Sequence, residues 1–131
     1  MNKKIGNDFE SELCKILSEN GYWAHNFAQN KSGQPSDIIC AKDRRTVLID
    51  CKVCSDGVFR LDRMEENQRL AMKKWSECGN SSGWFAVKLP DESVYMFMID
   101  FMLFLESKIG KMELDEHDIR ISGIPLEDWL W

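Results

Sequence analysis

The sequence predicts an α/β fold in which a mixed β-sheet is flanked by α-helices. Helical and strand periodicities alternate along the chain in the order helix, strands, helix, strands, helix. The 131 residues, 44% hydrophobic and 30% charged, suffice for a domain with a buried core and exclude a disordered or collagen-like chain. No internal repeat or linker-like segment divides the sequence, so we expect one domain over residues 1–131.

The first third of the chain predicts one helix followed by strands. Residues 6–20 place apolar side chains at helical spacing and end at an Asn-Gly stop signal. Residues 22–28 are rich in aromatics with some alternation, which indicates a strand, and residues 29–36 have loop composition. Residues 37–41 and 46–53 are apolar segments around a charged turn, and we expect them to pair as a hairpin.

A second helix is predicted over residues 65–78. Its apolar spacing assigns Leu70, Ala71 and Trp75 to the buried face. Residues 54–64 read as a connection that contains a short strand or a turn.

Two more strands and a short helix complete the predicted elements. The strands cover residues 84–89 and 94–98 around a Pro-Asp-Glu-Ser turn, and the helix covers residues 99–107. The chain beyond this helix has no clear periodicity, so we treat residues 108–131 as an acidic C-terminal extension.

Charge is distributed unevenly. Residues 1–90 carry 14 basic and 12 acidic side chains, whereas residues 91–131 carry 3 and 10. The net charge of −5 argues against a nucleic-acid partner, but this asymmetry allows one face to meet phosphates while the C-terminal part stays acidic. Trp129 and Trp131 in the acidic part either cover the core or form an interface.

The sequence predicts neither a membrane partner nor secretion. It has no stretch of about 20 apolar residues, and its first residues lack the apolar segment of a signal peptide. Five cysteines without a secretion signal indicate a reducing compartment, so we expect a cytoplasmic location. Cys51 and Cys54 have CxxC spacing, but positions three apart on a strand face opposite sides, which disfavours a shared metal or disulfide.

Three residues of the predicted hairpin carry chemical information. Asp50 and Lys52 are two apart on one strand and therefore share a face, while Asp37 begins the preceding strand. In a hairpin the carboxylates of Asp37 and Asp50 lie side by side. Such a pair is costly in a partly buried site unless a cation neutralises it.

A hard divalent ion fits this set of oxygen ligands. Mg²⁺ is the expected cofactor, with Mn²⁺ as a substitute, because Mg²⁺ keeps several waters and takes one or two carboxylates. A metal-bound water is a nucleophile for phosphodiesters, and the Lys52 ammonium beside it stabilises a pentavalent phosphate. The alternative is that an Asp and a Lys at this spacing are ordinary solvated neighbours on an exposed strand.

The set Asp37, Asp50 and Lys52 resembles the PD-(D/E)xK nuclease signature, with Ser36 just before the first aspartate. Within that superfamily the chain is most similar to Holliday-junction resolvases of archaeal, Gram-positive bacterial and phage type. Further similar segments follow in order along residues 5–105: Gly6 to Leu13, Lys31 to Gly33, Phe59 to Gln68, and Trp84 to Val87. The resemblance implies the restriction-endonuclease-like fold, with residues 5–105 as its core.

The resemblance also implies activity and site residues. It implies a homodimeric, Mg²⁺-dependent endonuclease that cuts branched or four-way-junction DNA in recombination or repair, leaving 5′-phosphate ends. It assigns Glu10 to the metal site with Asp37 and Asp50, and it assigns Gln68 to the catalytic group with Lys52. Glu10 and Gln68 also have a plainer interpretation as solvated helix residues.

Several basic or loop residues are candidates for DNA binding. Lys31 and Ser32 lie in a Gly-containing loop of the kind that often contacts phosphates. Arg60, Arg63, Arg69 and Lys73 cluster in sequence and are candidates for a surface that follows the DNA backbone. The alternatives are a plain surface turn for Lys31 and Ser32, and helix salt bridges of Arg69 and Lys73 with Glu65 and Glu66.

Two other functions stay open at this stage. One is a nuclease of the same superfamily that acts on flaps, nicks, mismatches or plain duplex. The other is a non-catalytic interaction module on the same scaffold, with the acidic extension and terminal tryptophans as its working surface. A homodimer requires an apolar partner surface, for which the Met- and Phe-rich residues 95–105 are a candidate, unless they are the last strand and helix of the core.

Overall fold

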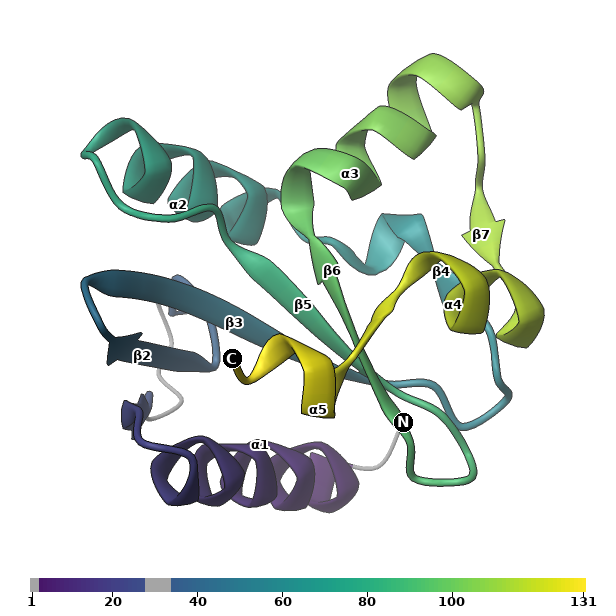
Figure 1. Cartoon of the computed structure of the whole chain (residues 1–131). Helices are drawn as coiled ribbons and strands as arrows, with labels where there is room; N and C mark the ends of the chain where they lie inside the picture. The colour runs from purple at the N-terminus through teal and green to yellow at the C-terminus, as the bar shows by residue number, and fades with distance from the viewer. Residues whose placement is uncertain (1–2, 28–33) are drawn as a thin grey trace.

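A six-stranded mixed sheet forms the centre of the molecule (Figure 1). The computed structural model describes residues 3–27 and 34–131. In sheet order the strands are β1 (Trp23–Asn26), β2 (Ile38–Lys42), β3 (Arg45–Val53), β5 (Trp84–Lys88), β6 (Val94–Met98) and β8 (Ile124–Pro125). Only β3 and β5 pair in parallel, and the other neighbours are antiparallel. The predicted α/β fold with a mixed sheet is confirmed.

Helices cover both faces of this sheet (Figure 1). The helical elements are α1 (Lys3–Glu19), the 3-10 turn η1 (Leu61–Arg63), α2 (Glu66–Glu77), α3 (Ile99–Phe104), the π-helical turn η2 (Leu105–Ile109), α4 (Glu116–Ser122) and α5 (Leu126–Trp129). Helices α1 and α5 pack on one face, and α2, α3 and α4 pack on the other. Two short strands, β4 (Phe59–Arg60) and β7 (Glu113–Leu114), form a separate antiparallel pair. Among the described helices, none is both long and apolar enough to cross a bilayer.

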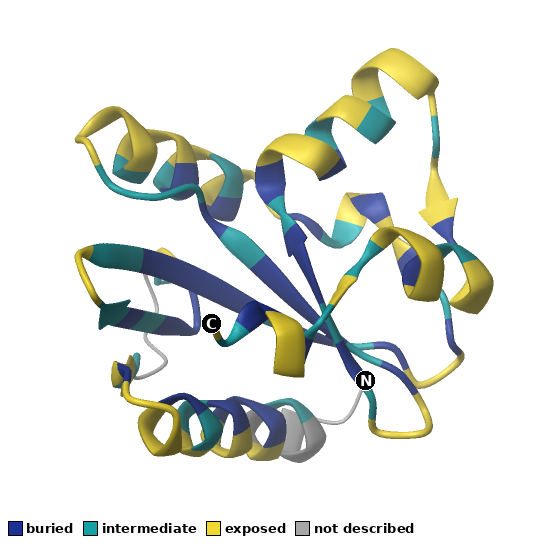
Figure 2. Cartoon of the chain, viewed as in Figure 1, coloured by how far each residue is buried: buried dark blue, intermediate teal, exposed yellow. Residues whose placement is uncertain are grey.

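Successive side chains of β3 point to opposite faces of the sheet, and the buried core accordingly has two layers (Figure 2). Ile49 faces α1, where Phe9 and Leu13 fill the space between helix and sheet. Leu48 faces the opposite layer, which holds Met72 of α2. Residues 50 and 52 share the parity of Leu48, so their side chains belong to the α2 side of β3.

The β2–β3 hairpin confirms the predicted pairing and sets its register. The ladder runs from Ile38 opposite Ile49 to Lys42 opposite Arg45. Asp43 and Arg44 form the two-residue turn, with φ of 49° and 69°. Positive φ at both central positions belongs to the turn whose twist matches that of paired strands, although a non-glycine residue such as Arg44 adopts it at some cost. The same register puts Asp37 next to Asp50.

The predicted buried face of α2 is wrong at Leu70. Its side chain is 57% exposed, whereas Gln68 and Met72 are buried and Trp75 is half-buried. The helix is rotated because Gln68 turns inward and its amide donates a hydrogen bond to a buried carboxylate of β3. A prediction from apolar spacing assigns no inward position to a glutamine, so it misses this rotation.

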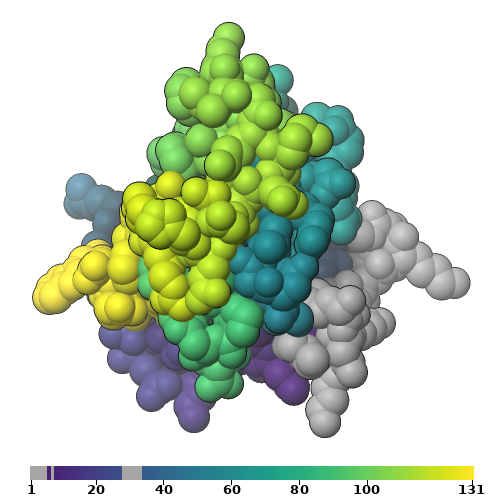
Figure 3. Space-filling model, turned by 90° about the vertical axis from the view of Figure 1, so that its right-hand side faces the viewer, coloured from purple at the N-terminus to yellow at the C-terminus, as the bar shows by residue number. Residues whose placement is uncertain are grey.

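The C-terminal residues, for which no element was predicted, complete both sheets. β8 pairs with β6, with Ile124 opposite Met96, and β7 pairs with β4, with Leu114 opposite Phe59. Figure 3 shows these residues, green to yellow, in one continuous surface with the teal residues near position 60. A Cβ at Gly123 would lie 2.7 Å from the Cβ of Tyr95, so this close approach requires glycine. The segment from β7 to α5 thus packs within the fold although its charge is acidic.

Candidate active site

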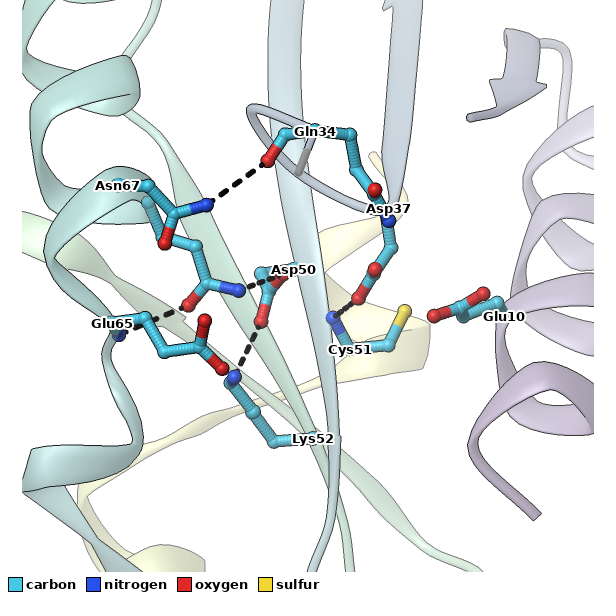
Figure 4. A pocket seen from close by; sticks show the side chains of 9 residues that line it. Glu10, Gln34, Asp37, Asp50, Cys51, Lys52, Glu65 and Asn67 are labelled. Carbon is cyan, nitrogen blue, oxygen red and sulfur yellow. Dashed lines mark hydrogen bonds and ion pairs between the residues drawn. The ribbon is translucent and has the colours of Figure 1, made fainter. Parts of the chain in front are cut away.

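A pocket of about 230 Å³ opens where α1, the start of β2, the end of β3 and the first turn of α2 meet (Figure 4). Its lining is almost entirely polar. The lining residues are Glu10, Gln34, Asp37, Asp50, Cys51, Lys52, Glu65, Asn67 and Gln68. All five residues that the sequence assigned to catalysis therefore lie in one pocket, although they come from four elements of the fold.

Asp50 lies at the centre of this pocket and is 1% exposed. Its Oδ1 accepts a hydrogen bond of 2.8 Å from the Gln68 amide. Its Oδ2 lies 3.0 Å from the Lys52 ammonium but accepts no directional hydrogen bond. Gln68 thus engages one oxygen of the carboxylate, while the other is buried with the Lys52 ammonium beside it.

Gln68 is held in place by the first turn of α2. The backbone N–H of Glu65 donates to the Gln68 Oε1 over 3.2 Å, while the other end of the same amide donates to Asp50. The side chain therefore links the start of α2 to β3 and fixes its own orientation. Nearby, the Asn67 amide donates to the backbone carbonyl of Gln34 over 3.4 Å, which ties α2 to the segment before β2.

Asp37 is fixed against β3 by backbone hydrogen bonds on both sides. Its Oδ2 accepts from the Cys51 N–H over 2.8 Å, and its own N–H donates to the Ile49 carbonyl over 3.1 Å. Just before it, the buried Ser36 hydroxyl donates to the Ile38 carbonyl and closes the turn into β2. The Asp37 carboxylate therefore has a fixed position beside Asp50.

Helix α1 supplies Glu10, which is 9% exposed. Phe9 and Leu13 anchor the apolar stripe of α1 on the sheet, and the residue after Phe9 consequently points along the sheet into the pocket. Glu12, by contrast, faces solvent and forms an ion pair with Lys88 at 3.7 Å. The rotation of α1 thus selects Glu10 over Glu12.

Burial, together with the charge of neighbouring carboxylates, raises the pKa values of Glu10 and Asp50. Burial, followed by hydrogen bonding and charge from Asp37, raises the pKa of Glu10 from 4.5 to about 8. Burial and the Asp37 charge likewise raise the pKa of Asp50 from 3.8 to about 7, although Lys52 opposes the shift. Too little positive charge surrounds these carboxylates, a deficit that a divalent cation removes.

The residues present fit a hard divalent cation. The donors are carboxylate oxygens, and Asp50 Oδ2 is buried without a hydrogen bond. In the described part of the chain, no three His, Cys, Asp or Glu side chains are already drawn together around one point at metal-binding distances.

Sequence reasoning missed part of the pocket. Cys51 was expected in apolar packing on the opposite face, and it does touch the α1-side core, but it also lines the pocket. Burial, together with the charges of the neighbouring carboxylates, raises the pKa of its thiol well above the usual value. Glu65 and Asn67 also line the pocket, and their closeness to Gln68 in sequence was the signal that could have found them.

The candidate DNA-binding residues do not form one uniform set. Arg69 forms a two-pronged ion pair with Glu106 over 2.6 and 2.8 Å and also bonds two backbone carbonyls, so its guanidinium is engaged within the fold. Arg69 therefore pairs with Glu106 and not with Glu65 or Glu66, the partners considered from the sequence. Lys73 is exposed on α2. Lys31 and Ser32 lie outside the described residues.

Arg60 and Arg63 line a second hollow of about 300 Å³ beyond the end of β3. Arg60 is half exposed and pairs with Asp56 at 3.0 Å. Arg63 donates to the Val53 carbonyl over 3.0 Å. Both guanidiniums thus flank the segment that continues from Lys52.

A polar pocket that gathers buried carboxylates and a lysine at the end of a central strand of a mixed sheet has the features of a nuclease active site. The chain belongs to the archaeal Holliday junction resolvase (Hjc) family, whose model matches residues 1–130, so it is an endonuclease of the junction-cleaving class. The fold also matches a solved structure of Hjc from Archaeoglobus fulgidus, described as a Holliday junction resolvase from an archaeal hyperthermophile. That match has a TM-score of 0.68 at 19% identity and covers 89% of this chain and 91% of the other. No curated protein matches the chain.

Proposed function

We propose that this chain cuts four-way DNA junctions with Mg²⁺ held by Glu10, Asp37 and Asp50, and that residues 1–131 act as one nuclease domain. The observation that carries the proposal is the shared pocket, which gathers three buried carboxylates and one lysine. When bound, the metal supplies an acidified water and charge stabilisation for phosphodiester hydrolysis. Mn²⁺, with the same ligand preference, serves as a substitute.

The chain's own residues supply position and charge. Gln68 and Lys52 hold the two oxygens of the Asp50 carboxylate from two sides, so that the carboxylate keeps one orientation. The Cys51 N–H does the same for Asp37. Lys52 places a positive charge where a phosphate entering the pocket develops negative charge.

A panel of DNA shapes tests the substrate. Four-way junction, flap, nicked duplex and linear duplex of equal arm length are incubated with Mg²⁺ under single-turnover conditions. We expect the four-way junction to be cut fastest. Equal rates on junction and linear duplex would instead support a nuclease of broader substrate range.

We further propose that the active species is a homodimer, because symmetric cuts across a junction need two sites related by a two-fold axis. Helix α3 exposes Phe101 and Phe104, by 36% and 49%, and offers an apolar surface for the partner. The strand before it, β6, is paired on both sides within the sheet and belongs to the core. Light scattering at low concentration should give twice the chain mass, and a strict monomer would contradict paired incision.

Replacing Lys52 should separate catalysis from metal binding. We expect Lys52→Met to lower the single-turnover cleavage rate by about a hundredfold or more, since a charge aimed at the transition state is lost. Mg²⁺ affinity measured by calorimetry should stay equal or rise, because a competing cation 3.0 Å from Asp50 is gone. Lys111→Met, at a lysine paired with Asp118 outside the pocket, is the matched control. Unchanged cleavage in Lys52→Met would remove this lysine from the mechanism.

The raised pKa values predict an unusual pH dependence of stability without metal. Between about pH 4.5 and 8, Glu10 is ionised in the unfolded chain but retains its proton in the folded one. The free energy of unfolding should therefore fall as pH rises through this window, and stay level below it where both states hold the proton. Urea titrations in EDTA at several pH values measure the slope.

Glu10→Gln should make that slope shallower and leave the part that Asp50 contributes, whereas Glu12→Gln, at the exposed neighbouring acid, should leave it unchanged. Mg²⁺ should raise stability most at the upper end of the window, because it binds the ionised carboxylates of the folded state. If the free energy of unfolding of wild type and of Glu10→Gln has the same pH dependence, the pKa of Glu10 is not raised in the folded protein.

A further inference from the structure

Three aromatic side chains follow one another on the edge of the sheet: Trp23 and His25 of β1, and Phe27 just after it. We call these three residues the aromatic row. The rings of Trp23 and His25 are nearly parallel, 16° apart, with centroids 6.2 Å from each other. The His25 and Phe27 rings meet edge to face at 5.8 Å. Trp23 is 64% exposed, so the outer end of the row presents a large aromatic face to solvent.

The aromatic row begins beside the active site. The N–H of Phe27 donates to the carbonyl of Asp37 over 2.9 Å, which places Phe27 one strand away from a proposed metal ligand. From there the row follows β1, with His25 opposite Ile39 and Trp23 opposite Ala41. At about 3.3 Å per residue it extends roughly 13 Å along the strand. The row thus extends from the neighbourhood of the pocket along the edge of the sheet.

Among the residues that the structure describes, no acidic one lines the hollow next to the row. It has a volume of about 450 Å³ and lies between Phe27 and α2. Its lining residues are Phe27, Pro35, Ile39, Leu48, Ala71, Lys74, Trp75, Cys78 and Asn80. Among them Lys74 alone is charged. In a chain of net charge −5, a surface lined by aromatic rings and one cation is complementary to nucleic acid.

We propose that unpaired bases near the branch point of the DNA stack on Trp23 and His25, while Lys74 meets the adjoining phosphates. The inference rests on the proposed function and adds a contact to it. Aromatic faces bind any base, because every base has a π-face, and each such contact contributes substantially to binding. The aromatic row would therefore favour DNA with open or splayed bases over continuous duplex without reading its sequence.

Binding measured in EDTA, where no cleavage occurs, tests the row directly. Two labelled four-way junctions are compared by fluorescence anisotropy, one fully paired and one with two unpaired thymines beside the crossover. We expect wild type to prefer the second. Trp23→Ala should weaken binding to it about tenfold and remove the preference. The slope of log affinity against log salt should stay the same, since no phosphate contact is lost.

Matched variants and a spectroscopic probe complete the test. Trp131→Ala, at a tryptophan 93% exposed at the chain end, should bind as wild type does, and Trp23→Phe should retain most of the preference. A 2-aminopurine in place of an unpaired thymine should be quenched on binding wild type but not Trp23→Ala.

Equal binding by Trp23→Ala and Trp131→Ala, or unaltered quenching in Trp23→Ala, would overturn the inference. A mass of Trp23→Ala that is half the wild-type mass in light scattering would also overturn it, because the row would then be an interface between two copies of the chain. Failure of the proposed function is distinguishable. Trp23-dependent binding in EDTA without any cleavage of the junction in Mg²⁺ would refute the nuclease assignment and leave the row standing.

Discussion

Asp50→Asn is expected to lower junction cleavage by more than about a thousandfold, because the proposed metal site loses several kcal/mol of charge stabilisation. The asparagine carbonyl oxygen can still accept the hydrogen bond that Gln68 now donates to Oδ1. Its amide group replaces Oδ2, the buried oxygen without a hydrogen bond, and presents hydrogens toward Lys52 and any cation. The substitution therefore removes the cation ligand with little change in volume.

Three measurements on this variant check the expectation. Single-turnover cleavage of a four-way junction gives the rate, calorimetry gives the Mg²⁺ and Mn²⁺ affinities, and anisotropy in EDTA gives junction affinity. Cleavage and metal binding should be lost together, while DNA binding should persist. Asp128→Asn, at an exposed aspartate of α5, is the control and should match wild type in all three. Normal cutting by Asp50→Asn would mean that the pocket is not the active site.

Trp129→Ala is expected to destabilise the fold by about 3–5 kcal/mol. The indole is 4% exposed and lies parallel to the Tyr22 ring at 5.8 Å. The edge of Trp84 meets it at 5.6 Å, and the guanidinium carbon of Arg45 sits 4.3 Å from its ring centroid. Truncation thus empties a large site between α5 and the sheet and also removes a cation–π contact.

Trp131→Ala provides the matched comparison. Because Trp131 is 93% exposed, its removal should change the free energy of unfolding by no more than about 0.5 kcal/mol. Urea denaturation followed by circular dichroism measures the stability of both variants. The slope of the free energy of unfolding against urea concentration should be the same as in wild type. A loss below about 1 kcal/mol in Trp129→Ala would show that α5 does not close the core in solution. The two tryptophans, which the sequence could not tell apart, have different environments.

Local sequence patterns were sufficient to predict the β2–β3 hairpin and the positions of the two carboxylates and the lysine on it. Alternation places Asp50 and Lys52 on one side of β3, and the charged two-residue turn sets the register that brings Asp37 next to them. These relations depend on residues close in sequence and on the strand period of two, so they hold before any distant contact forms. The predicted helices α1 and α2 follow from apolar spacing for the same reason.

Distant contacts decided what the local pattern left open. Gln68 is directed inward by its bond to Asp50, 18 residues earlier, and this rotation exposes Leu70. Similarly, residues 113–130 show weak periodicity because their strands have two residues each and their helices are short. Such elements are stable only when they pair with strands that are already formed.

The amino-acid sequence by itself determined the α/β class, the β2–β3 hairpin and the presence on it of two carboxylates and a lysine. The resemblance to a known family pointed to Glu10 and Gln68, but only the tertiary structure shows how the rotation of α1 and α2 brings them into the pocket, and only it decided that Trp129 closes the core. The physical reason is the range of the forces involved. Strand and helix periods act between neighbours, whereas helix rotation and the burial of single polar groups depend on packing and hydrogen bonding with partners distant in sequence.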